Sequence, residues 1–267
     1  ALAFGTQVCA TAIHADPEIG NQCPRTTAKL RAALDGLPLE IHESTSTTGF
    51  IAILRGGGDN SRTVLLRGDM DALPMPEETG LDFASQVPNA MHACGHDSHC
   101  SMLVGAARAL SARKDSLPGT VVFMFQPGEE GHHGARFMIE DGLLDIERPD
   151  SAFALHIYPN ARAGAIQTRP GALLASTDAL NFTIRGAGGH AAMPHDAMDP
   201  IPVAAEIVTA LSVFIARQIP ATDPAVLSIT KIEAGSAYNI IPDDVQMIGT
   251  LRTLSPKTRD KARTGLK

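Results

Sequence analysis

The chain has 267 residues, of which 44% are hydrophobic, with 24 glycines and 18 prolines, and this composition excludes a disordered or collagen-like protein. A chain of this length can bury a full core and can form two domains. Its formal net charge of −7 disfavours nucleic acids and anionic membranes as partners, because an acidic surface repels both.

Signals for export or membrane insertion are weak. No apolar run reaches the roughly 18 residues that a membrane-spanning helix needs, and residues 1–18 lack a basic segment followed by an apolar block. Four cysteines (Cys9, Cys23, Cys94 and Cys100) allow two disulfides, but without an export signal free thiols or a metal ligand are the expected state. We therefore predict a cytoplasmic protein.

The first part of the chain alternates strands and helices. We expect a helix at Thr26–Leu34, two strands joined by a turn at Ile51–Leu54 and Thr63–Leu66, a helix at Ser98–Arg113 capped by Asp97 or Ser98, a buried strand at 120–127, a short helix at Ala135–Glu140 and a buried strand at 151–159. The alternation predicts an α/β catalytic domain over residues 1–177, with a mixed sheet and helices on both faces.

From about Asp178 the pattern changes. Strands are expected at 179–186, 225–235 and 243–254, a helix at Pro200–Arg217, and a further helix beginning near Ser255. This β-α-β-β-α order is typical of a ferredoxin-like layer. Residues 178–267 are therefore predicted to form a smaller α+β domain that is incomplete at its C-terminus.

Polar side chains suited to metal binding lie at predicted strand ends. They are Asp69 and Asp71, Glu129 and Glu130, and His156, together with Cys94 and His96 just before a helix. Ligands of α/β sheets bind beyond the carboxyl ends of the strands, so these four stretches should meet at one rim of one sheet.

The residue types at this rim favour a transition metal. Thiolate, imidazole and carboxylate from Cys94, His96, Glu130 and His156 suit zinc or a similar ion, whereas calcium and magnesium prefer oxygen ligands alone. One carboxylate of the Glu129–Glu130 pair can bind the metal while its neighbour stays free to take a proton from a metal-bound water. Each residue alone also has an ordinary structural interpretation, as a packed side chain or a solvated turn.

Nearby residues have less definite roles. Asp69 and Asp71 are either ligands or groups that orient a ligand histidine, and we favour orientation for Asp71. His92 and His99 either support the ligands or pack in the ordinary way.

Six motifs occur in order along the chain: RGDMDALP, MHACGHDSH, QPGEEG, ALHIYP, GAGGHAAMPH and AYNIIPD. Together they resemble the M20 metallopeptidase family, in particular its amidohydrolase branch of hippurate hydrolases, N-acyl-amino-acid amidohydrolases and auxin-conjugate hydrolases. The resemblance implies a hydrolase with two divalent ions (zinc, manganese, cobalt or nickel) that cleaves the amide bond of small N-acyl or aryl-acyl amino acids. It also implies a homodimer formed through the smaller domain.

The resemblance implies roles for particular residues. Cys94, His96, Glu130 and His156 would be metal ligands, Glu129 the general base, Asp71 a supporting carboxylate, His190 a donor to the oxyanion, often in the partner subunit's site, and Asn239 and Arg252 ligands of the substrate carboxylate. The family also has a C-terminal segment that brings a further ligand histidine. Here the last histidine is His195 and the chain ends at Lys267, so we expect that segment to be missing.

Two alternatives use the same residues differently. In the first, Cys94 is a nucleophile with His96 or His156 as its base, and a thiol reagent rather than a chelator would inactivate the protein. In the second, the chain is a non-catalytic dimerising or binding remnant of the family, and hydrolysis assays beside a longer version would reveal it.

Overall fold

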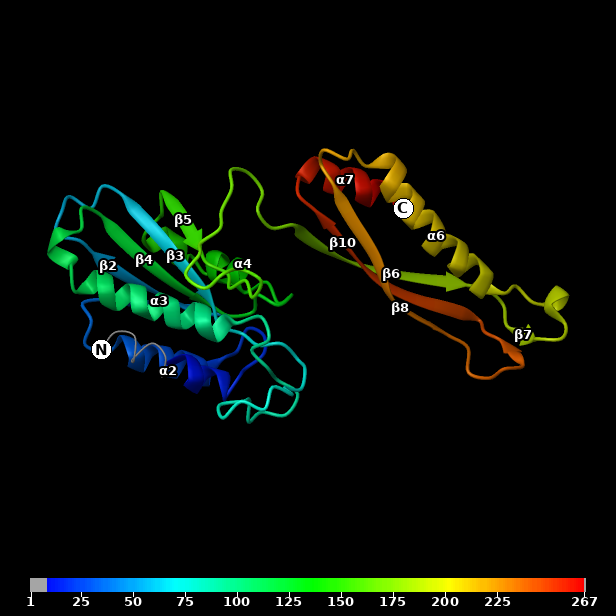
Figure 1. The fold of residues 1–267 in the computed structure, drawn as a ribbon, viewed down its shortest axis with the longest axis horizontal. Helices are drawn as coiled ribbons and strands as arrows, with labels where there is room; N and C mark the ends of the chain where they lie inside the picture. Colours follow the sequence, from blue (N-terminus) through cyan, green and yellow to red (C-terminus); the bar gives the residue numbers. More distant parts are fainter. Residues whose placement is uncertain (1–8, 267) are drawn as a thin grey trace. The chain divides into compact units, whose positions relative to one another are not determined.

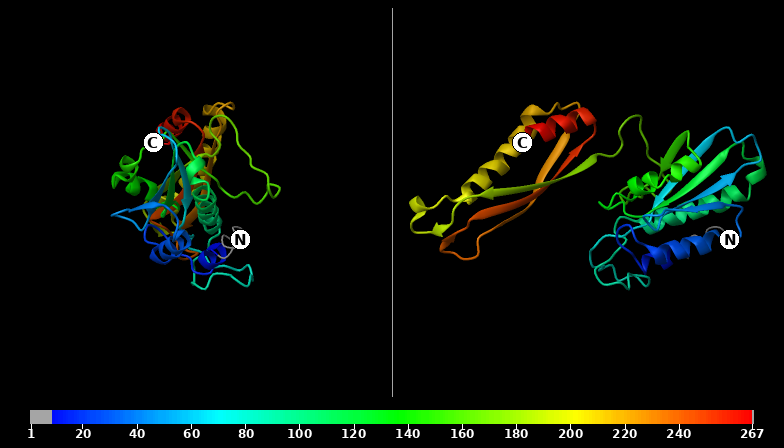
Figure 2. Two further views of the ribbon diagram at one scale, coloured as in Figure 1. Left: turned by 90° about the vertical axis from the view of Figure 1, so that its left-hand side faces the viewer. Right: turned by 180° about the vertical axis from the view of Figure 1, so that it is seen from behind.

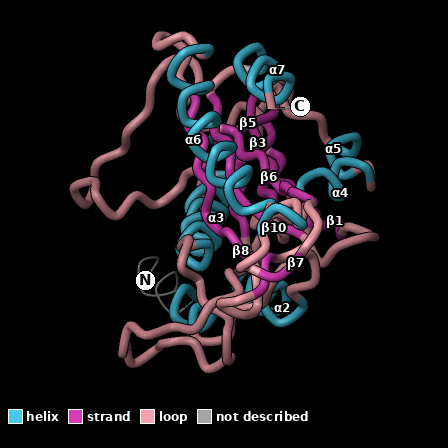
Figure 3. The backbone as a smooth tube through the Cα atoms, turned by 90° about the vertical axis from the view of Figure 1, so that its right-hand side faces the viewer, coloured by secondary structure: helices cyan, strands magenta, loops and turns pink. Residues whose placement is uncertain are grey.

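The computed structural model describes residues 9–266, which form two compact units that divide between Arg162 and Ala163. We expected the boundary between residues 177 and 178, just before the next predicted strand. The structural boundary comes earlier, inside a segment, 155–175, that contains neither helix nor strand. A second long segment of this kind covers residues 70–95, and both are drawn as loops in Figure 3.

The first unit is built on a five-stranded sheet in the order β1-β2-β4-β3-β5 (Figure 1). Its strands are β1 (Glu40–Glu43), β2 (Phe50–Arg55), β3 (Thr63–Asp69), β4 (Thr120–Gln126) and β5 (Ser151–Ala154). Strand β3 runs parallel to β4 and β5, whereas β1 with β2 and β2 with β4 are antiparallel. The predicted mixed α/β sheet is therefore confirmed.

Helices cover both faces of this sheet. They are α2 (Pro24–Leu34), α3 (His96–Ser111), α4 (Gly134–Glu140) and α5 (Leu143–Ile146), with a 3-10 turn, η1, at Lys114–Ser116. Phe50 and Phe123 pack with the residues of α2 and α3, and Ile51 and Val122 pack with those of α4 and α5. Successive side chains of a strand point to opposite faces, so β2 and β4 are buried on both sides and have continuous apolar sequences.

The order of the strands differs from the one expected. We expected β2 and β3 to be joined by a turn as neighbours, but β4 lies between them and pairs with both. The turn sequence after β2 is therefore a connection that passes the N-terminal end of β4, where Gly56 N–H donates to the Gly119 carbonyl oxygen. Pairing with a strand more than 50 residues away depends on tertiary packing, which a local turn pattern does not contain.

Strand β5 also differs from its prediction. We expected a buried strand over 151–159, but β5 ends at Ala154 and its residues are exposed, with Phe153 at 59%. It is one of the two edge strands of the sheet, with β1 at the other edge, and it pairs with β3 alone. His156 consequently lies on a loop two residues beyond the strand.

The second unit contains a three-stranded antiparallel sheet in the order β6-β10-β8 (Figure 2). Its elements are β6 (Ser176–Arg185), β7 (Gly189–His190), η2 (Pro194–Asp196), α6 (Pro200–Gln218), β8 (Ala225–Ala234), β9 (Ile240–Ile241), β10 (Asp244–Thr253) and α7 (Pro256–Gly265). Along β10 burial alternates, so Val245 and Met247 pack beneath α6 while Arg252 lies on the opposite face. The main elements follow the predicted β-α-β-β-α order.

Helix α6 corrects one expectation from the sequence. An 18-residue window of this 19-residue helix has a mean hydropathy of 1.5, so by length and composition the helix could cross a membrane, although we expected no such segment. A helix that covers a sheet passes the same test. Ala204, Ile207 and Val208 of α6 pack on the three-stranded sheet, which accounts for part of its apolar character.

Candidate metal centre

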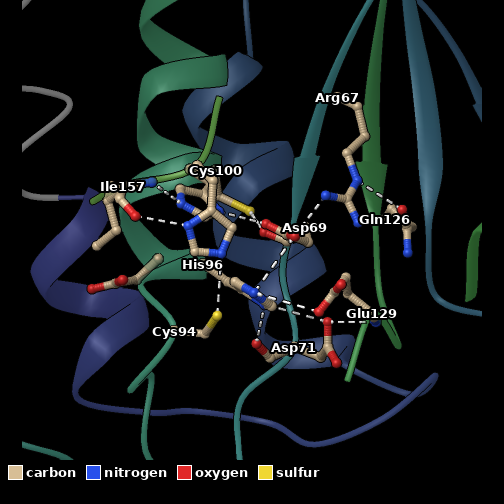
Figure 4. Close-up of polar contacts among 12 residues, drawn as sticks. Arg67, Asp69, Asp71, Cys94, His96, Cys100, Gln126, Glu129 and Ile157 are labelled. Carbon is tan, nitrogen blue, oxygen red and sulfur yellow. Dashed lines mark hydrogen bonds and ion pairs between the residues drawn. The ribbon is translucent and has the colours of Figure 1, made fainter. Parts of the chain in front are cut away.

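The predicted ligands of the first unit lie together beyond the carboxyl ends of β3 and β4 (Figure 4). Cys94 Sγ is 3.2 Å from His156 Nε2. Candidate ligand atoms of Cys94, His96 and His156 lie within 4.8 Å of one another, and the same holds for His96, Glu129 and Glu130. The sheet, the first turn of α3 and the loop after β5 thus bring all five side chains to one place.

The surroundings of His96 leave one of its nitrogens available. The Asp71 carbonyl oxygen lies 2.8 Å from His96 Nδ1 and can only accept, so the proton is on Nδ1. The other nitrogen, Nε2, is buried and has no hydrogen-bond partner among the described residues. A buried polar atom without a partner costs about 1–3 kcal/mol, and a bound cation would satisfy it.

The carboxylate of Asp71 contacts both a candidate ligand and the backbone of the glutamate pair. Its Oδ1 lies 3.5 Å from His96 Nδ1, beside the Asp71 carbonyl oxygen at 2.8 Å, and the carboxylate also accepts hydrogen bonds from the N–H groups of Glu129 (2.9 Å) and Glu130 (3.0 Å). Burial alone would raise the pKa of Asp71. The adjacent His96 and the two N–H groups outweigh burial and lower it. Asp71 is thus a charged support for the Glu129–Glu130 backbone.

The charges of the site favour a bound cation. Burial, with the carboxylates of Glu130, Glu129 and Asp69, raises the pKa of the Cys94 thiol to about 12. Burial, Glu130 and Asp69 also raise the pKa of Glu129. A metal ion deprotonates a coordinating thiol and offsets the repulsion between carboxylates. The mixed sulfur, nitrogen and oxygen donors therefore fit a transition metal.

The raised pKa of Cys94 weighs against the nucleophile alternative. A nucleophilic cysteine reacts as the thiolate, and reactive cysteines have lowered pKa values beside cationic groups. Cys94 instead has acidic neighbours. All four cysteines of the chain are free thiols.

A glycine between two candidate ligands shapes the start of α3. We expected Asp97 or Ser98 to cap this helix, but it begins at His96 with Gly95 as its N-cap and no side-chain cap. The Asp97 carboxylate is instead 2.8 Å from His14 Nδ1. Gly95 has a φ of 80°, and a Cβ there would lie 2.1 Å from Ile157 Cδ1. A side chain at this position would therefore strain the turn and displace Ile157.

We expect Gly95→Ala to weaken metal binding and to lower the free energy of unfolding by about 1–2 kcal/mol, the cost of a left-handed backbone for an L-residue. Displacement of Ile157 adds to this effect near His156. Gly36→Ala is the control, because Gly36 has a φ of 74° and no atom within 4 Å of the added Cβ. For each variant, urea denaturation measures the free energy of unfolding and metal titration measures the metal affinity. If the two variants bound metal equally well, the contact with Ile157 would have no role.

The remaining predicted residues lie in the second unit. His190 on β7 and Asn239 beside β9 are close together, because Ala191 N–H donates to the Asn239 carbonyl at 3.1 Å. Arg252 lies near the opposite end of β10 from Asp244, roughly 27 Å along an extended strand. Arg252 Nη1 donates to Thr177 Oγ1. Their roles in substrate binding stay predictions.

The sequence left two residues of the site without a definite role. His99 and Asp69 are both buried, and His99 Nδ1 is 2.6 Å from Asp69 Oδ1. A signal for His99 was present, because positions three apart on a helix share a face. His99 follows His96 at that spacing, and both side chains face Asp69 at the end of β3.

Comparisons with known proteins agree with the motifs. Residues 65–258 match the family model Peptidase family M20/M25/M40. N-acetylcysteine deacetylase of Bacillus subtilis (strain 168) is 40% identical over 248 residues, 92% of this chain and 64% of that protein. N-acetyldiaminopimelate deacetylase of Listeria monocytogenes serotype 4a (strain HCC23) is 40% identical over 257 residues, 96% of this chain and 68% of that protein.

Solved structures give the same result. The YXEP protein of Bacillus subtilis, described as a dinuclear metal binding peptidase from the M20 family, is 36% identical with a TM-score of 0.79, over 99% of this chain and 68% of that one. The chain spans less than two thirds of the length of several curated relatives, 62% to 64% in three of them. The resemblance indicated by the motifs is confirmed, and the chain belongs to peptidase family M20/M25/M40, with relatives in its amidohydrolase branch.

Proposed function

We propose that this chain is the metal-binding part of an amidohydrolase that cleaves the amide bond of N-acyl amino acids, with Glu129 as general base. The observation that carries the proposal is the convergence of Cys94, His96, Glu130 and His156 beside Glu129. The relatives named above act, by their names, on N-acetylated amino acids, which supports this substrate class.

Cys94, His96, Glu130 and His156 are the residues that would hold the metal. Two divalent cations in such a site supply a polarised carbonyl and an acidified water. Zinc, manganese, cobalt and nickel all accept this mixture of donors. His96 and His156 offer Nε2, because their Nδ1 atoms are bonded to the carbonyl oxygens of Asp71 and Ile157.

Glu129 moves the proton. Its side chain is 42% exposed, so it can reach both the candidate ligands and an incoming substrate, and Asp71 fixes its backbone. It accepts a proton from the attacking water and returns it to the leaving nitrogen. A raised pKa, caused by burial, Glu130 and Asp69, suits a group that must both take and give a proton near neutral pH.

His190 is proposed as the donor to the oxyanion. Ala192 N–H donates to His190 Nδ1 at 3.1 Å, so the ring proton is on Nε2, and His190 is exposed. An exposed imidazole with a fixed tautomer can donate from Nε2 to a developing negative charge. The proposal has three further parts. Asn239 and Arg252 bind the substrate carboxylate, the protein forms a homodimer through the smaller unit, and it is located in the cytoplasm.

Removal of the metal is the direct test. We expect hydrolysis of a small panel of N-acyl amino acids to be lost on chelation and restored by one of the four ions, with metal stoichiometry measured before and after. Inactivation by a thiol reagent that bound metal does not prevent would favour Cys94 as a nucleophile. Full metal binding without hydrolysis of any panel member would contradict the proposal and favour the binding remnant.

A further inference from the structure

A buried histidine, His99, connects the loop that carries His156 to the end of β3. His99 is 3% exposed, and its Nε2 accepts a hydrogen bond from Ile157 N–H at 2.9 Å. Because Nε2 accepts, the proton is on Nδ1, which donates to Asp69 Oδ1 at 2.6 Å. Both ring nitrogens are occupied. His99 is therefore not a metal ligand, although its atoms lie close to those of His96.

The side chain of Asp69 is in turn fixed by an ion pair with Arg67 (Figure 4). Arg67 Nη1 donates to Asp69 Oδ2 at 2.7 Å, and Arg67 Nε donates to Gln126 Oε1 at 2.8 Å. Burial alone would raise the pKa of Asp69, but the His99 hydrogen bond and the Arg67 charge lower it to about 2. The carboxylate, 1% exposed, is thus a charged and fixed acceptor for His99 at the end of β3.

Both the backbone N–H and the backbone carbonyl oxygen of Ile157 form hydrogen bonds with histidine side chains. Its N–H donates to His99, and its carbonyl oxygen accepts from His156 Nδ1 at 2.7 Å. That leaves the lone pair of His156 on Nε2, 3.2 Å from Cys94 Sγ. Strand β5 ends at Ala154, so the sheet ladder does not extend to this loop. A shift of the Ile157 backbone would therefore turn the His156 ring.

We propose that His99, held by Asp69, is a positioning residue that anchors the Ile157 backbone and so aims His156 at the metal centre. This inference rests on the proposed function, in which His156 is a metal ligand. A metal-bound histidine usually donates its other N–H to a fixed acceptor, and losing that support weakens metal binding about 10- to 100-fold. Here the acceptor is a loop carbonyl, and it is His99 that fixes the loop.

Two substitutions separate the two bonds of His99. In His99→Asn the side chain reaches the position of Nδ1 and keeps the contact with Asp69, but it has no acceptor for Ile157 N–H. In His99→Gln the amide oxygen reaches the position of Nε2 and keeps that acceptor. We expect His99→Asn to weaken Co²⁺ binding about 10- to 100-fold, and His99→Gln to recover most of the loss.

Competition with a chromogenic chelator measures the Co²⁺ affinity of the 267-residue chain. The visible spectrum is a second readout. The ligand-field bands of His99→Asn should change as they do in His156→Ala, while the thiolate band from Cys94 remains. If His99→Asn does not fold, Asp69→Asn keeps the side-chain shape, removes the charge that holds His99, and should also weaken binding.

His14→Asn is the matched control. His14 is also buried with both nitrogens bonded, to Asp97 at 2.8 Å and Glu77 at 3.2 Å, and neither partner is in the loop of His156. It should keep the wild-type affinity. Unchanged affinity in the folded His99→Asn or Asp69→Asn variant, equal losses in His99→Asn and His99→Gln, or an equal loss in His14→Asn would overturn the inference. A wild-type chain that binds Co²⁺ but cleaves no N-acyl amino acid would contradict the proposed function alone.

Discussion

Replacing Glu129 by Gln should abolish turnover while the protein keeps its metal. The glutamine has nearly the same shape but cannot accept the proton of the attacking water, and general bases contribute about 10²- to 10⁴-fold to rates. The metal should stay because Cys94, His96 and His156 are untouched and Asp71 still holds the backbone of residue 129. Measured kcat and elemental analysis of the purified variant test the two halves of this expectation.

A nearby glutamate provides the control for this substitution. Glu140 lies at the end of α4, where its carboxylate pairs with Arg136 on the surface. Glu140→Gln removes the same charge without touching the site and should leave kcat unchanged. Full activity in Glu129→Gln would reject its assignment as general base, and loss of metal from that variant would show that Glu129 is a ligand.

Replacing Cys94 by Ala should release the metal. The thiolate is the only sulfur donor of the proposed centre, and its removal also leaves His156 Nε2 without its 3.2 Å neighbour. We expect a fall in affinity greater than the roughly 100-fold that the loss of a supporting residue causes. Elemental analysis after gel filtration measures the metal content of the variant.

The metal affinity of the wild-type protein should rise with pH. The reason is that the metal must displace a proton from the Cys94 thiol, whose pKa is about 12.

Cys23→Ala is the control for the thiol. Cys23 is also a free thiol and is fully buried, whereas Cys94 is partly buried, and the Sγ of Cys23 donates to the carbonyl oxygens of Gly20 and Glu18, outside the group of candidate ligands. This variant should be less stable and yet bind metal as the wild type does. Unchanged metal content in Cys94→Ala would exclude Cys94 as a ligand and return the cysteine to an ordinary packing role.

Much of the first unit could be predicted from local patterns. Strands β2, β3 and β4 are apolar runs bounded by glycine, proline or charged residues, and α3 has an apolar face at helical spacing, so each was found within a few residues. The strand order was not predictable in the same way. Strand β4 separates β2 from β3 because it can bury both of its faces there, which is a property of the assembled sheet.

The sequence by itself determined which side chains are the candidates for the chemistry. Cys94, His96, Glu129, Glu130 and His156 are recognisable because a metal needs those donor types and because each stands at the end of an element with a local signature. Their spacing along the chain and the six motifs were sufficient to identify the family.

Only the tertiary structure decided how those side chains are held. The Asp71 carboxylate supports the backbone of Glu129 in addition to lying beside His96, and His99 joins Asp69 to the Ile157 peptide. These hydrogen bonds connect residues 30 to 58 positions apart. Their geometry depends on strand register and on where β5 ends, and neither is encoded in any short stretch of the sequence.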